Sequence, residues 1–162
     1  MQQWKREILL SLMWLAVDSP LRISAEANED FTPLFNGKNL HGWVAVGTAD
    51  AFIVKNNAIF STGAGPYPSW LRTEQEYENF ALRFEYQTED WYEGGILLHA
   101  PLHGPGSKLG FKIHLRHEKK AYGLRSPGAI YDAAAPRSIA NLPSGKWNRC
   151  EINCDWPHLR IT

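Results

Sequence analysis

The sequence predicts an all-β protein, folded as an antiparallel sandwich or barrel. Short apolar segments alternate with period two, and turn-forming Asn, Gly and Pro residues separate them. No long run of helical periodicity occurs after the first 30 residues. Many short strands with turns between them are typical of sandwiches and barrels, and 162 residues are enough for one domain with a core.

The chain begins with a predicted secretory signal peptide at residues 1–27. A basic Lys-Arg pair precedes an apolar run of ten residues, 8–17, which is too short to span a bilayer. Small residues suited to cleavage follow at Ala25 and Ala27. A buried amphipathic helix and a start site placed too early are the alternatives. We therefore expect an exported protein, periplasmic or extracellular, with its domain at residues 28–162.

Strands are expected from residue 52 onwards. Asn56 and Asn57 lie between two apolar runs and predict a hairpin, because Asn tolerates positive φ. The clearest strand is 80–87, in which apolar residues alternate with Ala, Arg, Glu and Gln. Further strands are expected at residues 70–73, 95–99, 111–117, 129–131, 147–156 and from 159. The alternation predicts a core that contains Phe80, Leu82, Phe84, Ile96, Leu98, Phe111, Ile113, Leu115 and Ile152.

The two cysteines are expected to stay unpaired. Cys150 and Cys154 lie four residues apart on one predicted strand. A strand separates such residues by about 13 Å, whereas a disulfide needs Cα atoms closer than about 7 Å. We expect both to be small core residues.

Charge and aromatic content narrow the class of partner. The 17 Lys and Arg balance the 17 Asp and Glu, so nothing in the charge indicates nucleic acid. Seven Trp, six Tyr and seven Phe suit sheet packing, and they also suit stacking on sugar rings.

One predicted strand carries an unusual polar face. In 111–117, Lys112, His114 and Arg116 share one side, and we expect that side to face water or a ligand. His114 and His117 are three residues apart and therefore point to opposite sides, so their spacing does not indicate a metal site. The cofactor is left open: a divalent cation is possible on chemical grounds, but ligand spacing does not point to one.

Six segments together resemble one known family. They are FTPLFNGKNLHGW at 31–43, NFALRFEYQ at 79–87, GGILLH at 94–99, GFKIHLRHE at 110–118, SPGAIYDAAAP at 126–136 and SGKWNRCEI at 144–152. The chain resembles the bacterial 3-keto-disaccharide hydrolase domain family over nearly everything after residue 30. The resemblance implies a concanavalin-A-like, laminarinase-like jelly roll. It also implies cleavage of glycosides already oxidised to a ketone at carbon 3, and further C-terminal strands beyond Thr162.

The chain departs from the family pattern at three places. Glu93-Gly94-Gly95 stands where members commonly carry Asn-Ser-Gly, and His99 stands where they commonly carry Arg. Lys112-Ile113-His114 stands where they often show Glu-x-Gln. Basic groups thus replace acidic and amide groups of the expected groove.

The chemistry implied by the resemblance assigns roles to this polar face. His114 is the expected base, and Lys112 and Arg116 are the expected stabilisers of an enolate. The expected substrate-binding residues are His99, Glu85, Arg83, Glu93 and Tyr131. The expected partner is an oxidised oligosaccharide or another glycoside. A carbohydrate-binding module without catalysis and an inactive fragment are the alternatives.

Overall fold

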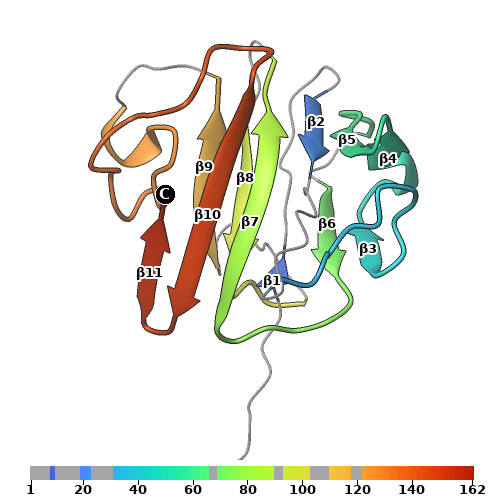
Figure 1. Cartoon of the computed structure of the whole chain (residues 1–162), viewed down its shortest axis with the longest axis horizontal. Coiled ribbons are helices and arrows are strands. Elements are labelled where there is room, and N and C mark those ends of the chain that lie inside the picture. The colour runs from blue at the N-terminus through green and yellow to red at the C-terminus, as the bar shows by residue number, and fades with distance from the viewer. Residues whose placement is uncertain are drawn as a thin grey trace, which may run out of the picture.

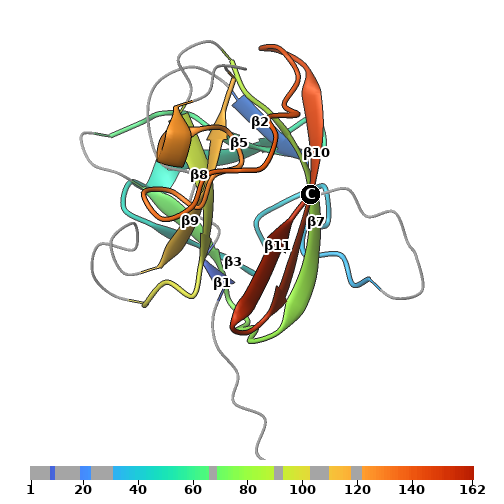
Figure 2. The ribbon, with the colours of Figure 1, turned by 90° about the vertical axis from the view of Figure 1, so that its left-hand side faces the viewer.

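A computed structural model describes residues 8–9, 19–22, 31–65, 69–89, 93–102, 110–117 and 122–162, the first two ranges by their backbone alone. The protein is an all-β antiparallel sandwich of two layers (Figure 1). Figure 2 shows the sandwich from the side, with β8 and β9 in one layer and β7, β10 and β11 in the other. The predicted fold class is confirmed.

One layer is a six-stranded sheet. Its order is β11-β10-β7-β2-β5-β4, and every neighbouring pair is antiparallel. The strands are β2 (Ser19–Arg22), β4 (Phe52–Lys55), β5 (Ala58–Ser61), β7 (Phe80–Gln87), β10 (Trp147–Asp155) and β11 (His158–Ile161). Its longest pairing joins β7 to β10, from Trp147 opposite Gln87 to Cys154 opposite Phe80.

The other layer carries the candidate site. Its three-stranded sheet has the order β1-β8-β9, with β1 (Ile8–Leu9), β8 (Glu93–Leu98) and β9 (Phe111–Arg116). A separate pair joins β3 (Trp43–Val46) to β6 (Trp70–Thr73). Two short 3₁₀ turns complete the described elements, η1 (Ala49–Ala51) and η2 (Gly123–Arg125).

The predicted hairpin at residues 52–60 is confirmed. Asn56 and Asn57 connect β4 to β5 with φ values of 52° and 57°. Two consecutive positive φ angles match the twist of the flanking strands, and Asn adopts them at low cost.

The core lies between the two layers. Leu82 and Phe84 of β7 pack there with Ile96 of β8 and Ile113 of β9, and all four are buried. Leu98, Leu115 and Ile152 are buried in the same cluster, while Phe80 is partly buried against it. These positions confirm the predicted core apart from one residue.

Phe111 is the exception. It is 37% exposed, because it is the first residue of β9 and its ring packs on Trp156 of the β10–β11 turn, 5.5 Å between centroids. The prediction that Phe111 belongs to the buried core is therefore wrong. The alternation of a strand predicts which face a side chain occupies. Whether that side chain is covered depends also on its place in the strand, and Phe111 lies at the start of β9.

The cysteine prediction is confirmed. Cys150 and Cys154 are both free, on the single strand β10. Cys154 is buried, and Cys150 packs against the core from a half-buried position.

Two strands lie within the predicted signal peptide. Ile8 pairs with Leu98, so that β1 borders β8, and β2 lies between β5 and β7. The expected cleavage region at Ala25 and Ala27 lies outside the described residues. The signal peptide therefore stays a prediction.

β11 is the outermost strand of the six-stranded sheet. The continuation of the domain into further strands beyond Thr162 also stays a prediction. Within the described ranges, no helix has the length and apolar character needed to cross a bilayer.

Candidate functional site

The candidate site lies on the outer face of β8 and β9. Alternation directs Lys112, His114 and Arg116 away from the core residues of β9, as predicted. In the pairing of β8 with β9, His114 lies opposite Gly95 and Arg116 lies opposite Glu93. Glu93 and Gly95 therefore share the outer face with the three basic residues.

A segment that follows β9 folds back over this face, and we call residues 122–132 the covering segment. Its backbone continues the sheet beyond β9: Tyr131 N–H donates to Lys112 C=O at 2.8 Å, and His114 N–H donates to Ala129 C=O at 2.9 Å. Gly128 N–H donates to His114 C=O at 2.8 Å. The η2 turn at its start brings a carbonyl group to the His114 ring.

Lys112 and His114 are buried beneath the covering segment. Their exposed fractions are 4% and 0%. The expectation that this polar face is open to water or a ligand is wrong for these two side chains. The reason is that only a short apolar strand at 129–131 was expected in this segment, and nothing in the sequence indicates that the segment returns over β9.

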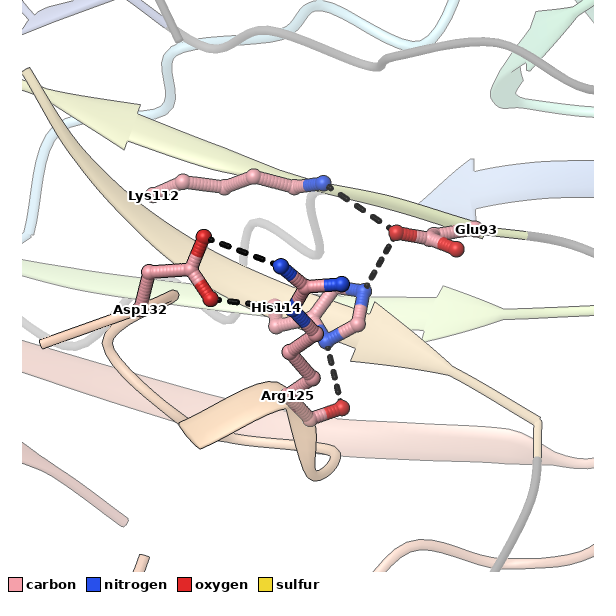
Figure 3. A network of polar contacts seen from close by, with 5 residues as sticks. All are labelled: Glu93, Lys112, His114, Arg125 and Asp132. Atoms are coloured by element: carbon pink, nitrogen blue, oxygen red, sulfur yellow. Dashed lines mark hydrogen bonds and ion pairs between the residues drawn. The ribbon is translucent and has the colours of Figure 1, made fainter. Parts of the chain in front are cut away.

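An oxygen atom lies close to each nitrogen of the His114 ring, and of the two contacts only that of Nδ1 has hydrogen-bond geometry (Figure 3). Nδ1 lies 2.9 Å from the carbonyl oxygen of Arg125, and Nε2 lies 3.2 Å from Oε1 of Glu93. A carbonyl oxygen can only accept, so Nδ1 carries the hydrogen and donates. Burial lowers the pKa of His114, and the charge of Lys112 lowers it further, while Glu93 acts in the opposite direction.

Lys112 reaches the same carboxylate. Its Nζ lies 3.9 Å from Glu93 Oε1 and 4.6 Å from the centroid of the Tyr131 ring. Among the described residues this buried amine has no hydrogen-bond partner. Burial lowers the pKa of Lys112, and the nearby Glu93 only partly offsets that effect.

Gly95 makes room for the Lys112 side chain. A Cβ at Gly95 would lie 2.9 Å from both Cγ and Cε of Lys112 and 2.5 Å from the carbonyl oxygen of Ile113. The lysine chain therefore crosses β8 over the position where any other residue would place a side chain. Glycine is required at this position because the Lys112 side chain and the Ile113 carbonyl lie too close for a Cβ atom.

Exposed charges form the rim of the site. Arg125 donates to Asp132 through Nε at 2.9 Å and through a terminal nitrogen at 3.4 Å, and both side chains are more than half exposed. Tyr131 stands between this pair and the interior, with its ring edge-on to His114 at 5.0 Å and with Arg125 Cζ 5.3 Å away. We refer to Glu93, Lys112, His114, Arg125, Tyr131 and Asp132 as the polar cluster.

Arg116 lies at the margin of the polar cluster. Its guanidinium carbon is 4.8 Å from the centroid of the Tyr122 ring, at the start of the covering segment. The structure thus brings together four of the predicted site residues, Glu93, Lys112, His114 and Tyr131, and places Arg116 beside them.

His99 does not join the polar cluster. β8 ends at Leu98, and His99 adopts a left-handed φ of 50°, which turns its side chain away from the outer face. Its Nε2 lies 3.4 Å from the Cys154 sulfur, and its ring lies 4.8 Å from that of Trp156. The expected position of His99 beside the basic face is therefore wrong.

Arg83 and Glu85 also lie elsewhere. Both project from β7 on the outside of the six-stranded layer, where Arg83 pairs with Glu151 at 2.6 Å and Glu85 pairs with Arg149 at 2.9 Å. Arg83 also stacks on Phe31, 4.0 Å from guanidinium carbon to ring centroid. The expectation that these residues complete the same groove is wrong, because β7 belongs to the opposite layer from β8 and β9.

No pattern in the sequence indicated Arg125 and Asp132 as site residues. Asp132 has a positive φ of 56°, which Asp tolerates better than most residues, and it follows Tyr131 in the segment SPGAIYDAAAP. That segment was a signal of the family, but it does not indicate that Arg125 and Asp132 pair. In the part of the chain that the structure describes, no group of three or more His, Cys, Asp or Glu gathers as a metal site would require.

The fold and the site together define an antiparallel β-sandwich protein with a polar cluster on the outer face of one layer. Comparison with family models identifies the family. The model of the 3-keto-alpha-glucoside-1,2-lyase-like domain matches residues 30–162, so the chain belongs to that family. No curated protein matches the chain.

Proposed function

We propose that this protein is an exported hydrolase or lyase that cleaves the glycosidic bond of 3-keto-glycosides by elimination and then hydration. One observation supports the proposal beyond family membership. A carboxylate, Glu93, meets an imidazole and an amine at a single oxygen on the sheet face, so groups able to take up a proton stand beside cationic groups.

The reaction needs both kinds of group. A ketone at carbon 3 acidifies the hydrogen on carbon 2, and a base removes it to leave an enolate. The enolate electrons then form the second bond between carbons 1 and 2, and the group on carbon 1 leaves with its oxygen, which takes up a proton. Water later adds to carbon 1 while a proton returns to carbon 2. A well-placed base contributes about 10²- to 10⁴-fold to such a step.

The cationic groups suit the enolate oxygen. Arg125 is exposed at the rim, and Lys112 and Arg116 add positive charge from β9. Fixed cations close to a developing oxyanion stabilise it without reorganisation, which is how such groups lower a barrier.

Export rests on the first 27 residues. Their basic pair and apolar run favour a secretory leader. Removal of the leader would take β1 and β2 out of their sheets, where they pair with β8 and with β5 and β7, so cleavage is tested together with export.

The activity is tested by comparing a 3-keto-disaccharide with its unoxidised parent. We expect the full chain to cleave 3-keto-sucrose or 3-keto-trehalose, with products read by mass, and to leave sucrose or trehalose intact. In deuterated water, the released keto sugar should carry deuterium on carbon 2, because elimination breaks that bond to hydrogen. Binding of the keto sugar without turnover would instead indicate a carbohydrate-binding module.

A further inference from the structure

We infer that Glu93, rather than His114, takes the proton from carbon 2 of the sugar. His114 is then a positioning residue, which holds this proton on Glu93 from the buried side of the carboxylate. The inference rests on the proposed function and assigns the base within the same site.

Access to the substrate separates the two residues. A base must come within about 2.6–3.2 Å of the group whose proton it removes. His114 is 0% exposed, and its two nitrogens already face Arg125 C=O and Glu93 Oε1. The Glu93 side chain is 34% exposed. A sugar on the sheet face can therefore reach the carboxylate but not the imidazole behind it.

The hydrogen positions explain what His114 does there. Because Nδ1 donates to the Arg125 carbonyl, the neutral ring presents the lone pair of Nε2 to Glu93 Oε1. A lone pair facing an ionised carboxylate is unfavourable, whereas the same lone pair accepts a hydrogen bond from a protonated one. Neutral His114 can thus accept a hydrogen bond from Glu93 once that carboxylate has taken up a proton.

Three cationic groups also lie around Glu93. Lys112 and Arg116 both lie on β9, and Arg116 is the residue paired with Glu93 of β8. Arg125 lies on the covering segment. Positive charges favour the ionised carboxylate. Asp132 reduces the contribution of Arg125 by pairing with it, and burial weakens that of Lys112 by lowering its pKa.

The proton balance of the step follows from these contacts. The bond between carbon 2 and hydrogen breaks, its electron pair enters the enolate, and a bond forms between the proton and the Glu93 carboxylate. The proton is then held between Oε1 and Nε2 of His114. It passes by way of solvent to the departing oxygen of carbon 1. The water that then adds gives its hydroxyl to carbon 1 and its proton, through Glu93, to carbon 2, so Glu93 ends the cycle ionised.

Three variants of the full chain test the assignment with a 3-keto-disaccharide. We expect Glu93→Gln to lower kcat by at least about 100-fold, the scale of a lost general base. We expect His114→Gln to lower kcat by about tenfold or more, and to move the acidic limb of the kcat/KM profile to lower pH. A glutamine amide can donate to the ionised Glu93 and so reduces its proton affinity.

The matched control is Glu151→Gln. Glu151 is also a strand carboxylate paired with a cation of the neighbouring strand, but it lies on the outside of the other layer, 2.6 Å from Arg83. Its replacement should leave turnover and the pH profile unchanged. A large loss of turnover in the control would show that removing any such ion pair is enough to lower activity. That result would overturn the assignment of Glu93 as the base.

A measurement without substrate tests the contact itself. In ¹⁵N NMR of the His114 ring, we expect the tautomer with hydrogen on Nδ1 and a titration midpoint that falls in Glu93→Gln, because the carboxylate favours the imidazolium. An unchanged midpoint would overturn the role given to His114.

The outcomes separate the inference from the function on which it rests. No cleavage by the wild-type chain would refute the proposed function. Cleavage by the wild type with undiminished turnover in Glu93→Gln would leave that function standing and overturn this inference alone.

Discussion

Replacement of Gly95 with alanine probes how the site is packed. The new methyl group would stand 2.9 Å from Cγ and Cε of Lys112 and 2.5 Å from the carbonyl oxygen of Ile113. Real Cβ atoms essentially never approach other heavy atoms this closely, so both neighbours must move. The lysine chain is flexible, but the Ile113 carbonyl belongs to the backbone of β9, which is paired with β8 on one side and bonded to the covering segment on the other.

The expected cost is that of overpacking a tightly packed site. Such insertions cost about 1–3 kcal/mol. For a domain of this size, each kcal/mol lowers Tm by about 2–4 °C, so thermal unfolding followed by circular dichroism should show a fall of about 2–12 °C. The same variant should lose turnover, because Lys112 can no longer lie beside Glu93.

A second background identifies the clashing group. In Lys112→Ala, the Cγ and Cε atoms are gone, and only the Ile113 carbonyl still opposes the new methyl group. We expect Gly95→Ala to cost less in that background, by at least about 0.5 kcal/mol, as is usual for residues in contact. Equal costs in the two backgrounds would refute the reasoning that Lys112 lies across Gly95.

Three further predictions follow from the core, the buried histidine and the leader. Phe84→Ala should reduce the free energy of unfolding by about 3–5 kcal/mol in a denaturant titration, and a loss below about 1 kcal/mol would contradict its burial. Because the pKa of His114 is lowered in the folded state, the unfolded chain binds more protons just below pH 6.5. Stability should therefore fall as pH drops below 6.5, more steeply in the wild type than in His114→Gln. N-terminal sequencing of exported protein should begin near Glu26 or Asn28, and retention of Met1 would argue instead that β1 and β2 stay in the sheets.

Local alternation was enough to locate most strands. The predicted ranges 70–73 and 80–87 agree with β6 and β7 residue for residue. The hairpin at Asn56 and Asn57 was equally predictable, because its conformation depends on those two residues alone. Period two and turn chemistry are properties of neighbouring residues, so they can be read without knowledge of the rest of the chain.

The composition of the candidate site was predictable only within one strand. That Lys112 and His114 share a face follows from their spacing, and the structure agrees. Their burial does not follow from spacing, because it depends on the covering segment. That segment, residues 122–132, lies along β9 and is held there by backbone hydrogen bonds. Arg125 enters the site through its carbonyl group, a contribution that no side-chain pattern can indicate.

The sequence by itself determined the fold class, the family, the hairpin and which side chains of each strand share a face. Only the tertiary structure decided which layer a strand joins and what lies over it. Arg83 and Glu85 were correctly expected to face away from the core, yet β7 belongs to the layer opposite Glu93. The alternation predicted that His99 would be the last residue of β8. The strand ends one residue earlier, and a positive φ at His99 turns its ring toward Cys154. The physical reason is that alternation orients a side chain relative to its own backbone, whereas a site is made by contacts between backbones far apart in the chain.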